Sequence, residues 1–189
     1  MMPPRAKGER LDRSVPRRRA YHSPTVLDLA HDSLHSVGRL RLRVTGHSMA
    51  PFLQDGDTVW VEPLDAACLR QGDLVLVRVA DDLLTHRLVA VDDAGWHTKG
   101  DNVSAADPPV AAAAILGRVV AAERRGQAVD YRQTRWAIAN RVLGALGYIE
   151  VKLPLHGSGP TARLARRGVG VLRRMSRQLV ALPEPGPAR

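Results

Sequence analysis

The apolar residues that follow Gly38 recur at every second position, and this short period constrains the fold more than any other feature. Leu40, Leu42 and Val44 alternate with arginines, which is typical of a half-buried strand. Many short strands with almost no helix between them predict a mainly β fold, a coiled antiparallel or barrel-like sheet. Further strands are expected at 58–62, 73–79, 83–91, 95–99, 115–122 and 127–132, each bounded by Gly, Asp or Asn turn residues.

Helical spacing is found on both sides of this β-rich region. Apolar residues share one helix face between Leu27 and Val37, before Gly38, and again from about Thr134. Beyond a proline-containing break, residues 161–182 have helical spacing with an arginine-rich face. We therefore predict a disordered basic arm over 1–23, a β-rich domain over 24–132 with its core at 40–120, and a basic helical extension over 133–189.

The net charge of +9 is unevenly distributed along the chain. Residues 1–19 carry seven Lys/Arg and two acids, and residues 121–189 carry thirteen and four, whereas residues 40–120 carry seven and eleven. An acidic body is therefore expected between two basic ends. No run approaches the roughly 20 apolar residues that span a bilayer, and the first 19 residues do not resemble a secretory signal. These features predict a cytoplasmic protein.

The arginines between Arg163 and Arg177 suggest a peripheral contact with an anionic membrane or with an acidic partner. A solvated helix that covers the domain is the competing interpretation. The chain has only seven aromatic residues, none interleaved with the basic runs, so stacking on single-stranded nucleic acid is not supported. We expect no specific nucleic-acid partner.

No metal or cofactor is expected from the sequence. The single cysteine, Cys68, rules out an internal disulfide and argues against a cysteine zinc site; we expect it to be buried or half-buried. His31 and His35 are four residues apart, but the glutamate of an H-E-x-x-H motif is missing. A solvated polar helix face is the better interpretation of this histidine pair.

Ser48 lies in a turn-prone frame, between Gly46 and Pro51. A serine hydroxyl is a poor nucleophile at neutral pH, so it needs a base and a third group that holds the base. His86 and a later aspartate are residues of the required types. Taken alone, the serine motif is more typical of an ordinary turn, and a lone histidine in a strand is usually a half-exposed polar residue.

Several further segments, found in a fixed order along the chain, favour a functional interpretation of these residues. Over residues 40–120 the chain resembles the type I signal peptidases and their relatives, the SOS-repressor peptidases. The resemblance implies a mostly β peptidase domain of coiled antiparallel strands. It rests on Gly46-His47-Ser48-Met49-Ala50-Pro51, Gly56-Asp57 with Val59 and Val61, Gly72-Asp73-Leu74-Val75, His86-Arg87-Leu88-Val89, Lys99-Gly100-Asp101-Asn102 with Asp107, and Gly117-Arg118-Val119.

By this resemblance Ser48 is the nucleophile, His86 the general base, Asp107 the orienting acid and Asp101 a second carboxylate of the site. Most bacterial relatives have lysine at the position of His86, whereas the eukaryotic and archaeal signal peptidases have histidine. Lys99 is an alternative base.

The residues just before the serine also bear on the chemistry. Gly46-His47 places no hydroxyl two residues upstream of Ser48, unlike the Ser-Gly of many relatives. The backbone N–H of Ser48, with a neighbouring amide such as that of Met49, would therefore stabilise the oxyanion.

The resemblance implies a serine endopeptidase that cleaves a peptide or protein precursor through an acyl-enzyme. Two alternatives remain open: an inert module of the same fold that acts through its basic C-terminal helix, and a self-cleaving regulator. A self-cleaving repressor would need a DNA-binding helical module, and residues 1–39 contain one short helix pattern. The polar residues 20–44 differ from the membrane segment that precedes the serine in signal peptidases. The substrate-binding residues cannot be selected from the sequence.

Overall fold

The computed structural model describes residues 26–152 and Val171. The predicted disordered arm and, apart from Val171, the basic segment between Arg163 and Arg177 lie outside the described residues.

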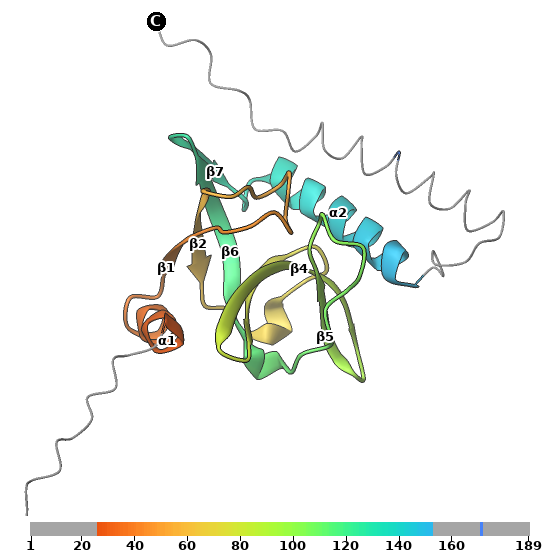
Figure 1. Ribbon diagram of the computed structural model, residues 1–189, viewed down its shortest axis with the longest axis horizontal. Helices are drawn as coiled ribbons and strands as arrows, with labels where there is room; N and C mark the ends of the chain where they lie inside the picture. The colour runs from red at the N-terminus through yellow and green to blue at the C-terminus, as the bar shows by residue number, and fades with distance from the viewer. Residues whose placement is uncertain (1–25, 153–170, 172–189) are drawn as a thin grey trace, which may run out of the picture.

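In the described residues seven strands form one antiparallel sheet, which confirms the predicted mainly β fold. Their order is β1-β2-β6-β3-β4-β5, and β7 pairs with β6. β4 curls strongly in Figure 1, but the sheet does not close, because β1 and β5 do not pair with each other in the described part of the chain. The strands are β1 (Leu40–Arg43), β2 (Thr58–Glu62), β3 (Leu74–Val79), β4 (Asp82–Asp92), β5 (Gly95–Lys99), β6 (Ile115–Arg124) and β7 (Gln127–Asp130).

β6 joins the two halves of the sheet. Its residues Arg118–Glu123 pair with β2 along one edge. Along the other edge, its first residues pair with β3 and its last residues with β7. The ten residues of β6 therefore connect the β1-β2 pair to the β3-β4-β5 hairpins that carry the histidine.

β3 is buried on both faces, which explains why its sequence, Leu-Val-Leu-Val, lacks polar alternation. Leu74 and Leu76 belong to one hydrophobic cluster, with residues of β1, β2, β6 and both helices. Val75 and Val77 belong to a second cluster on the other face. Since a one-residue slip would exchange the two faces, the burial of β3 specifies the register in which His86 lies opposite Val75.

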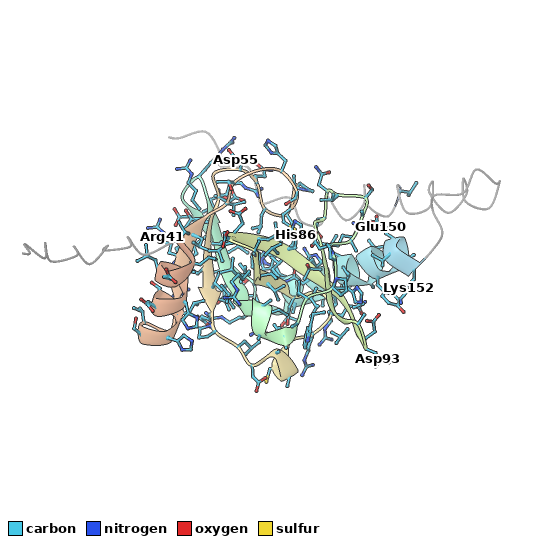
Figure 2. The ribbon with its side chains drawn as sticks, turned by 60° about the horizontal axis from the view of Figure 1, so that its bottom comes forward. Arg41, Asp55, His86, Asp93, Glu150 and Lys152 are labelled. Atoms are coloured by element: carbon cyan, nitrogen blue, oxygen red, sulfur yellow. The ribbon has the colours of Figure 1, made fainter. Side chains whose placement is uncertain are left out.

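The two α-helices of the described residues lie at opposite ends of the folded body (Figures 1 and 2), and both contribute to the first cluster. α1 (Val26–Ser36) buries Ala30 and Leu34, two of the apolar positions predicted to share its inner face. His31 and His35 are exposed. No helix in the described part of the chain combines the length and apolar character needed to cross a membrane.

α2 (Thr134–Lys152) begins where the sequence predicts a helix, but several of its apolar residues face outward. Its buried residues are Trp136, Asn140, Gly144 and Gly147, whereas Ile138 and Val142 are exposed, as is Ile149. The glycines explain this orientation, because a Cβ on Gly144 would lie 2.5 Å from the Cα of Gly72. Close backbone packing therefore decides which face of α2 meets the sheet.

The expectation that Cys68 is buried or half-buried is wrong. Cys68 is exposed, because it closes the short 3-10 helix Ala66–Cys68 in the connection between β2 and β3. Leu69, the next residue, is the one that packs into the second cluster.

The contact between Gly144 and Gly72 predicts the effect of one added methyl group. Gly144→Ala should destabilise the protein by about 2 kcal/mol or more, because the two backbones must separate, although alanine is the better helix former. Urea unfolding followed by circular dichroism measures the change. Gly126→Ala is the matched control, since a Cβ there meets nothing within 4 Å, and its positive φ costs about 1 kcal/mol. Equal stability of Gly144→Ala and the parent protein would contradict the packing argument.

Candidate active site

Ser48 lies in the connection between β1 and β2, at a turn whose inner side is anchored in the core. Gly46 has a φ of 84°, a left-handed conformation that suits glycine, and its N–H donates to Asp55 Oδ1 at 2.9 Å. Met49 is 3% exposed and Leu53 is fully buried. The apolar residues hold this segment against the core while Ser48 remains partly accessible.

A partly buried ion pair holds the far end of the same connection. Arg124, the last residue of β6, donates from Nε and Nη2 to the two carboxylate oxygens of Asp57, at 2.9 and 2.6 Å. Its Nη2 also donates to the carbonyl oxygens of Pro51 and Phe52. Bidentate pairing of this kind restricts geometry as well as adding energy, so the serine turn is fixed at both ends.

His86 extends from β4 toward Ser48 and is only 4% exposed. Its Nε2 lies 3.0 Å from Ser48 Oγ, and its Nδ1 lies 2.6 Å from Asp107 Oδ2. Figure 2 shows His86 near the middle of the folded body. Because an ionised carboxylate only accepts hydrogen bonds, Nδ1 carries the proton and Nε2 presents its lone pair to the serine hydroxyl.

Asp107 is held in place by Thr98, a residue that the sequence reasoning missed. Thr98 Oγ1 donates to Asp107 Oδ2 at 2.7 Å, and the Asp107 N–H donates to the Thr98 carbonyl at 2.9 Å. Thr98 is buried on β5. Its position just before the Lys99-Gly100-Asp101-Asn102 segment is the only local signal that could have drawn attention to it.

Asp101 pairs with a different group. It accepts from Arg87 Nε at 2.8 Å and from Arg87 Nη2 at 2.7 Å. Arg87 is completely buried, and its Nη1 donates to the Gly72 carbonyl and to Asn140 Oδ1. The structure therefore places Asp107 against the histidine and Asp101 in a buried arginine network beside it.

The Arg87 guanidinium also packs on an aromatic cluster. Its central carbon lies 4.7 Å from the centre of the Phe52 ring, and Phe52 contacts the rings of Tyr131 and Trp136. Burial raises the pKa of the Tyr131 phenol far above its ordinary value, so this ring stays neutral over the whole working range. The guanidinium thus has one anionic partner, two neutral acceptors and an aromatic face.

Lys99, the alternative base, is 2% exposed. Its Nζ lies 2.6 Å from Glu150 Oε2 of α2 and donates to the Gly100 carbonyl at 3.2 Å. Figure 2 shows Glu150 on α2. This ion pair favours a structural role for Lys99, and His86 is the group within hydrogen-bond distance of the serine.

The residues after Lys99 close over the serine turn. The Asn102 N–H donates to the Ser48 carbonyl at 2.7 Å, and the Asn102 side chain to the His47 carbonyl at 3.2 Å. A Cβ on Gly100 would lie 2.7 Å from the Ser48 carbonyl oxygen and 3.1 Å from His86 Nε2. Only glycine allows this approach, so Gly100-Asp101-Asn102 forms a backbone clamp on the Ser48 turn.

The backbone amides of Ser48 and Met49, which the sequence suggests for the oxyanion site, have no acceptor among the described residues. Met49 Sδ instead accepts from the Asp101 N–H at 3.4 Å. These two N–H groups lie at Ser48 and at the residue that follows it.

A cleft of about 440 Å³ opens beside Ser48. Apolar side chains make up about half of its lining, and the polar side chains Arg43, Thr45, Thr85, Asp81 and Asp82 also line it. The sequence did not identify these lining residues, because they come from five separate segments. The apolar lining comprises Val26, Leu42, Val44, Met49, Val59, Leu76, Leu83 and Leu84.

Potential metal-ligating groups do not gather elsewhere in this part of the chain. Within residues 26–152 and Val171, no three His, Cys, Asp or Glu side chains are placed to hold an ion. The candidate site is thus a serine, a histidine and an aspartate beside a partly apolar cleft.

A fold and a site of this kind define a class of serine-peptidase-like domains. The sequence model of the family described as Peptidase S24-like matches residues 17–120, which is more than half of the chain. The protein therefore belongs to the Peptidase S24-like family. A search of curated proteins finds no match. α2 lies after the matched region.

The clamp predicts that Gly100→Ala will impair the site more than the fold. The added Cβ would push against the Ser48 carbonyl and His86 Nε2, so the rate at which a fluorophosphonate labels Ser48 should fall at least about 100-fold. Gly126→Ala serves as the control and should be labelled at the parent rate. Parent-like labelling of Gly100→Ala, with mass spectrometry locating the label on Ser48, would contradict the clamp.

Proposed function

We propose that this protein is a serine endopeptidase in which Ser48 is the nucleophile, His86 the general base and Asp107 the orienting acid. The observation that carries the proposal is the unbroken chain of hydrogen bonds from Ser48 Oγ through the imidazole to the Asp107 carboxylate. This is the arrangement that activates a serine hydroxyl. The family membership supports the reaction class.

The geometry suggests the order of proton transfers. His86 Nε2 takes the hydroxyl proton as Ser48 Oγ attacks the peptide carbonyl carbon, and the imidazolium is stabilised by Asp107. The carbonyl oxygen becomes an oxyanion that the N–H groups of Ser48 and Met49 stabilise. When the peptide C–N bond breaks, Nε2 returns the proton to the leaving amine. A water molecule, deprotonated by the same nitrogen, then attacks the ester and restores Ser48.

The cleft beside Ser48 is suited to a peptide in extended form. Its apolar lining would accept aliphatic side chains of the substrate, while hydrogen bonds to the peptide backbone would provide affinity independent of sequence. Small side chains next to the cleaved bond are expected if the preference of the resembled peptidases carries over. The substrate is then a peptide or protein precursor.

The residue that acts as base places the chain nearer to one branch of the resembled peptidases. His86 occupies the position at which the eukaryotic and archaeal signal peptidases have histidine, whereas most bacterial ones have lysine. We infer a Ser-His-Asp mechanism of that type, with Asp101 contributing through its pairing with Arg87.

The first prediction of this proposal concerns the nucleophile and the base. Ser48→Ala and His86→Ala should each lower peptide hydrolysis by at least about 10³-fold while the protein stays folded. Hydrolysis is measured by mass spectrometry on a peptide library with small residues at varied positions. His97→Ala is the matched control, because His97 is also paired with an aspartate on the same sheet, but on an exposed surface. Undiminished cleavage by Ser48→Ala would refute the proposed function.

A second prediction separates the orienting acid from other aspartates. Asp107→Asn should reduce kcat by about 10³-fold or more, because an amide can no longer hold the histidine in the productive tautomer. Asp92→Asn, at the exposed His97 pair, should leave kcat within about twofold of the parent value. Equal kcat values for the two variants would exclude Asp107 from the site.

A further inference from the structure

α2 contacts both sides of the turn that clamps Ser48, although it lies after the region matched by the family model. We propose that Asn140 and Glu150 are positioning residues, which hold the Lys99–Asn102 turn against the nucleophile and thereby set the reactivity of Ser48. The expected effects on reaction rate rest on the proposed function. The contacts themselves rest on the structure alone.

The first contact passes through Asn140 and Arg87 to Asp101. Asn140 is 8% exposed, and its Oδ1 accepts from Arg87 Nη1 at 2.8 Å. The same guanidinium holds both carboxylate oxygens of Asp101. Removal of the Asn140 oxygen would leave a buried N–H without its acceptor, which is unfavourable, and the guanidinium would shift to recover a partner.

The second contact is the ion pair between Glu150 and Lys99. The side chains of Lys99 and Glu150 are 3% and 9% exposed, and the Nζ and Oε2 atoms lie 2.6 Å apart. A buried ammonium that loses its carboxylate is strongly unfavourable. Lys99 would then have to move toward water, and Gly100 follows it directly in the chain.

These two contacts are coupled by the sheet. Arg87 on β4 lies directly opposite Lys99 on β5, a pairing of like charges that is unfavourable unless each cation has its own anion. Asp101 neutralises Arg87, and Glu150 neutralises Lys99. α2 therefore supplies the carboxylate that allows both cations to be buried behind the serine turn.

The clamp transmits this arrangement to the nucleophile. Asp101 and Asn102 hold the serine turn through their backbone N–H groups, which donate to Met49 Sδ and to the Ser48 carbonyl. A displacement of the clamp by a fraction of an ångström would change the Ser48–His86 distance. In the described part of the chain, α2 contributes no residue to the lining of the cleft beside Ser48. Loss of the Asn140 or Glu150 contact should therefore alter the rate of reaction and leave substrate binding unchanged.

The test compares paired variants of full-length protein. Asn140→Leu removes the acceptor at similar volume, and Asn140→Asp retains it. Glu150→Leu removes the charge and the acceptor, and Glu150→Gln retains an acceptor. Leu143→Ala is the matched control on α2, because Leu143 packs against the hydrophobic core and should lower stability without moving the clamp.

Fluorophosphonate labelling of Ser48 provides the first measurement. We expect the limiting labelling rate of Asn140→Leu and Glu150→Leu to fall about 10- to 100-fold, with an unchanged half-saturating probe concentration. Asn140→Asp should restore most of the rate, Glu150→Gln should restore part of it, and Leu143→Ala should match the parent. Rates for both leucine variants within twofold of the Leu143→Ala rate would overturn the inference.

Hydrogen exchange of backbone amides provides a second measurement that needs no catalytic activity. The Asn102 N–H, bonded to the Ser48 carbonyl, should exchange faster in Asn140→Leu and Glu150→Leu than in Leu143→Ala of equal or lower stability. Parent-like exchange at Asn102 in both leucine variants refutes the positioning role. A parent protein that the fluorophosphonate does not label refutes the proposed function instead, and the exchange data still decide the role of α2.

Discussion

The burial of the Arg87 guanidinium is the interaction on which the rest of the structure depends. A fully desolvated cation is tolerated only when it is paired and its donors are satisfied. Four separate segments meet this demand, because its partners are Asp101, the Gly72 carbonyl, Asn140 and the face of Phe52. The arginine thus contacts the turn before β3, the loop after β5, α2 and the loop that carries Ser48. All four segments meet at one point of β4, immediately beside His86.

The geometry of the candidate site follows from these contacts of Arg87 and from the register of β3 and β4. His86 and Arg87 are neighbours on one strand, so their side chains point to opposite faces of the sheet. The histidine faces Ser48 and Asp107, while the arginine faces α2. The same strand therefore carries the proposed base on one side and the group that organises its surroundings on the other.

Much of the fold could be predicted from the sequence because it is expressed in local patterns. The two-residue period after Gly38 and the turn residues between strands identify β2 and β5 with their observed bounds, and the remaining strands within three residues at either end. The sequence of β3 does not alternate between apolar and polar residues, since the strand is buried on both faces. Its flanking turns and β-branched residues were nevertheless enough to predict a strand. The buried face of α2 was harder to predict from the sequence, because small residues pack inward there and larger apolar ones point outward.

The sequence by itself determined that the chain has a β-rich body, since strand and turn patterns are local. Its resemblance to the signal peptidases and SOS-repressor peptidases made Ser48, His86, Asp101 and Asp107 the residues to consider. Only the tertiary structure decided which aspartate meets the histidine, that Thr98 holds Asp107, and that Lys99 pairs with Glu150. These contacts join residues from separate elements. Lys99 and Glu150 are far apart in the chain, and no local pattern encodes their contact. The contact forms because α2 packs its glycines against the sheet and a buried charge is stable only when it is paired.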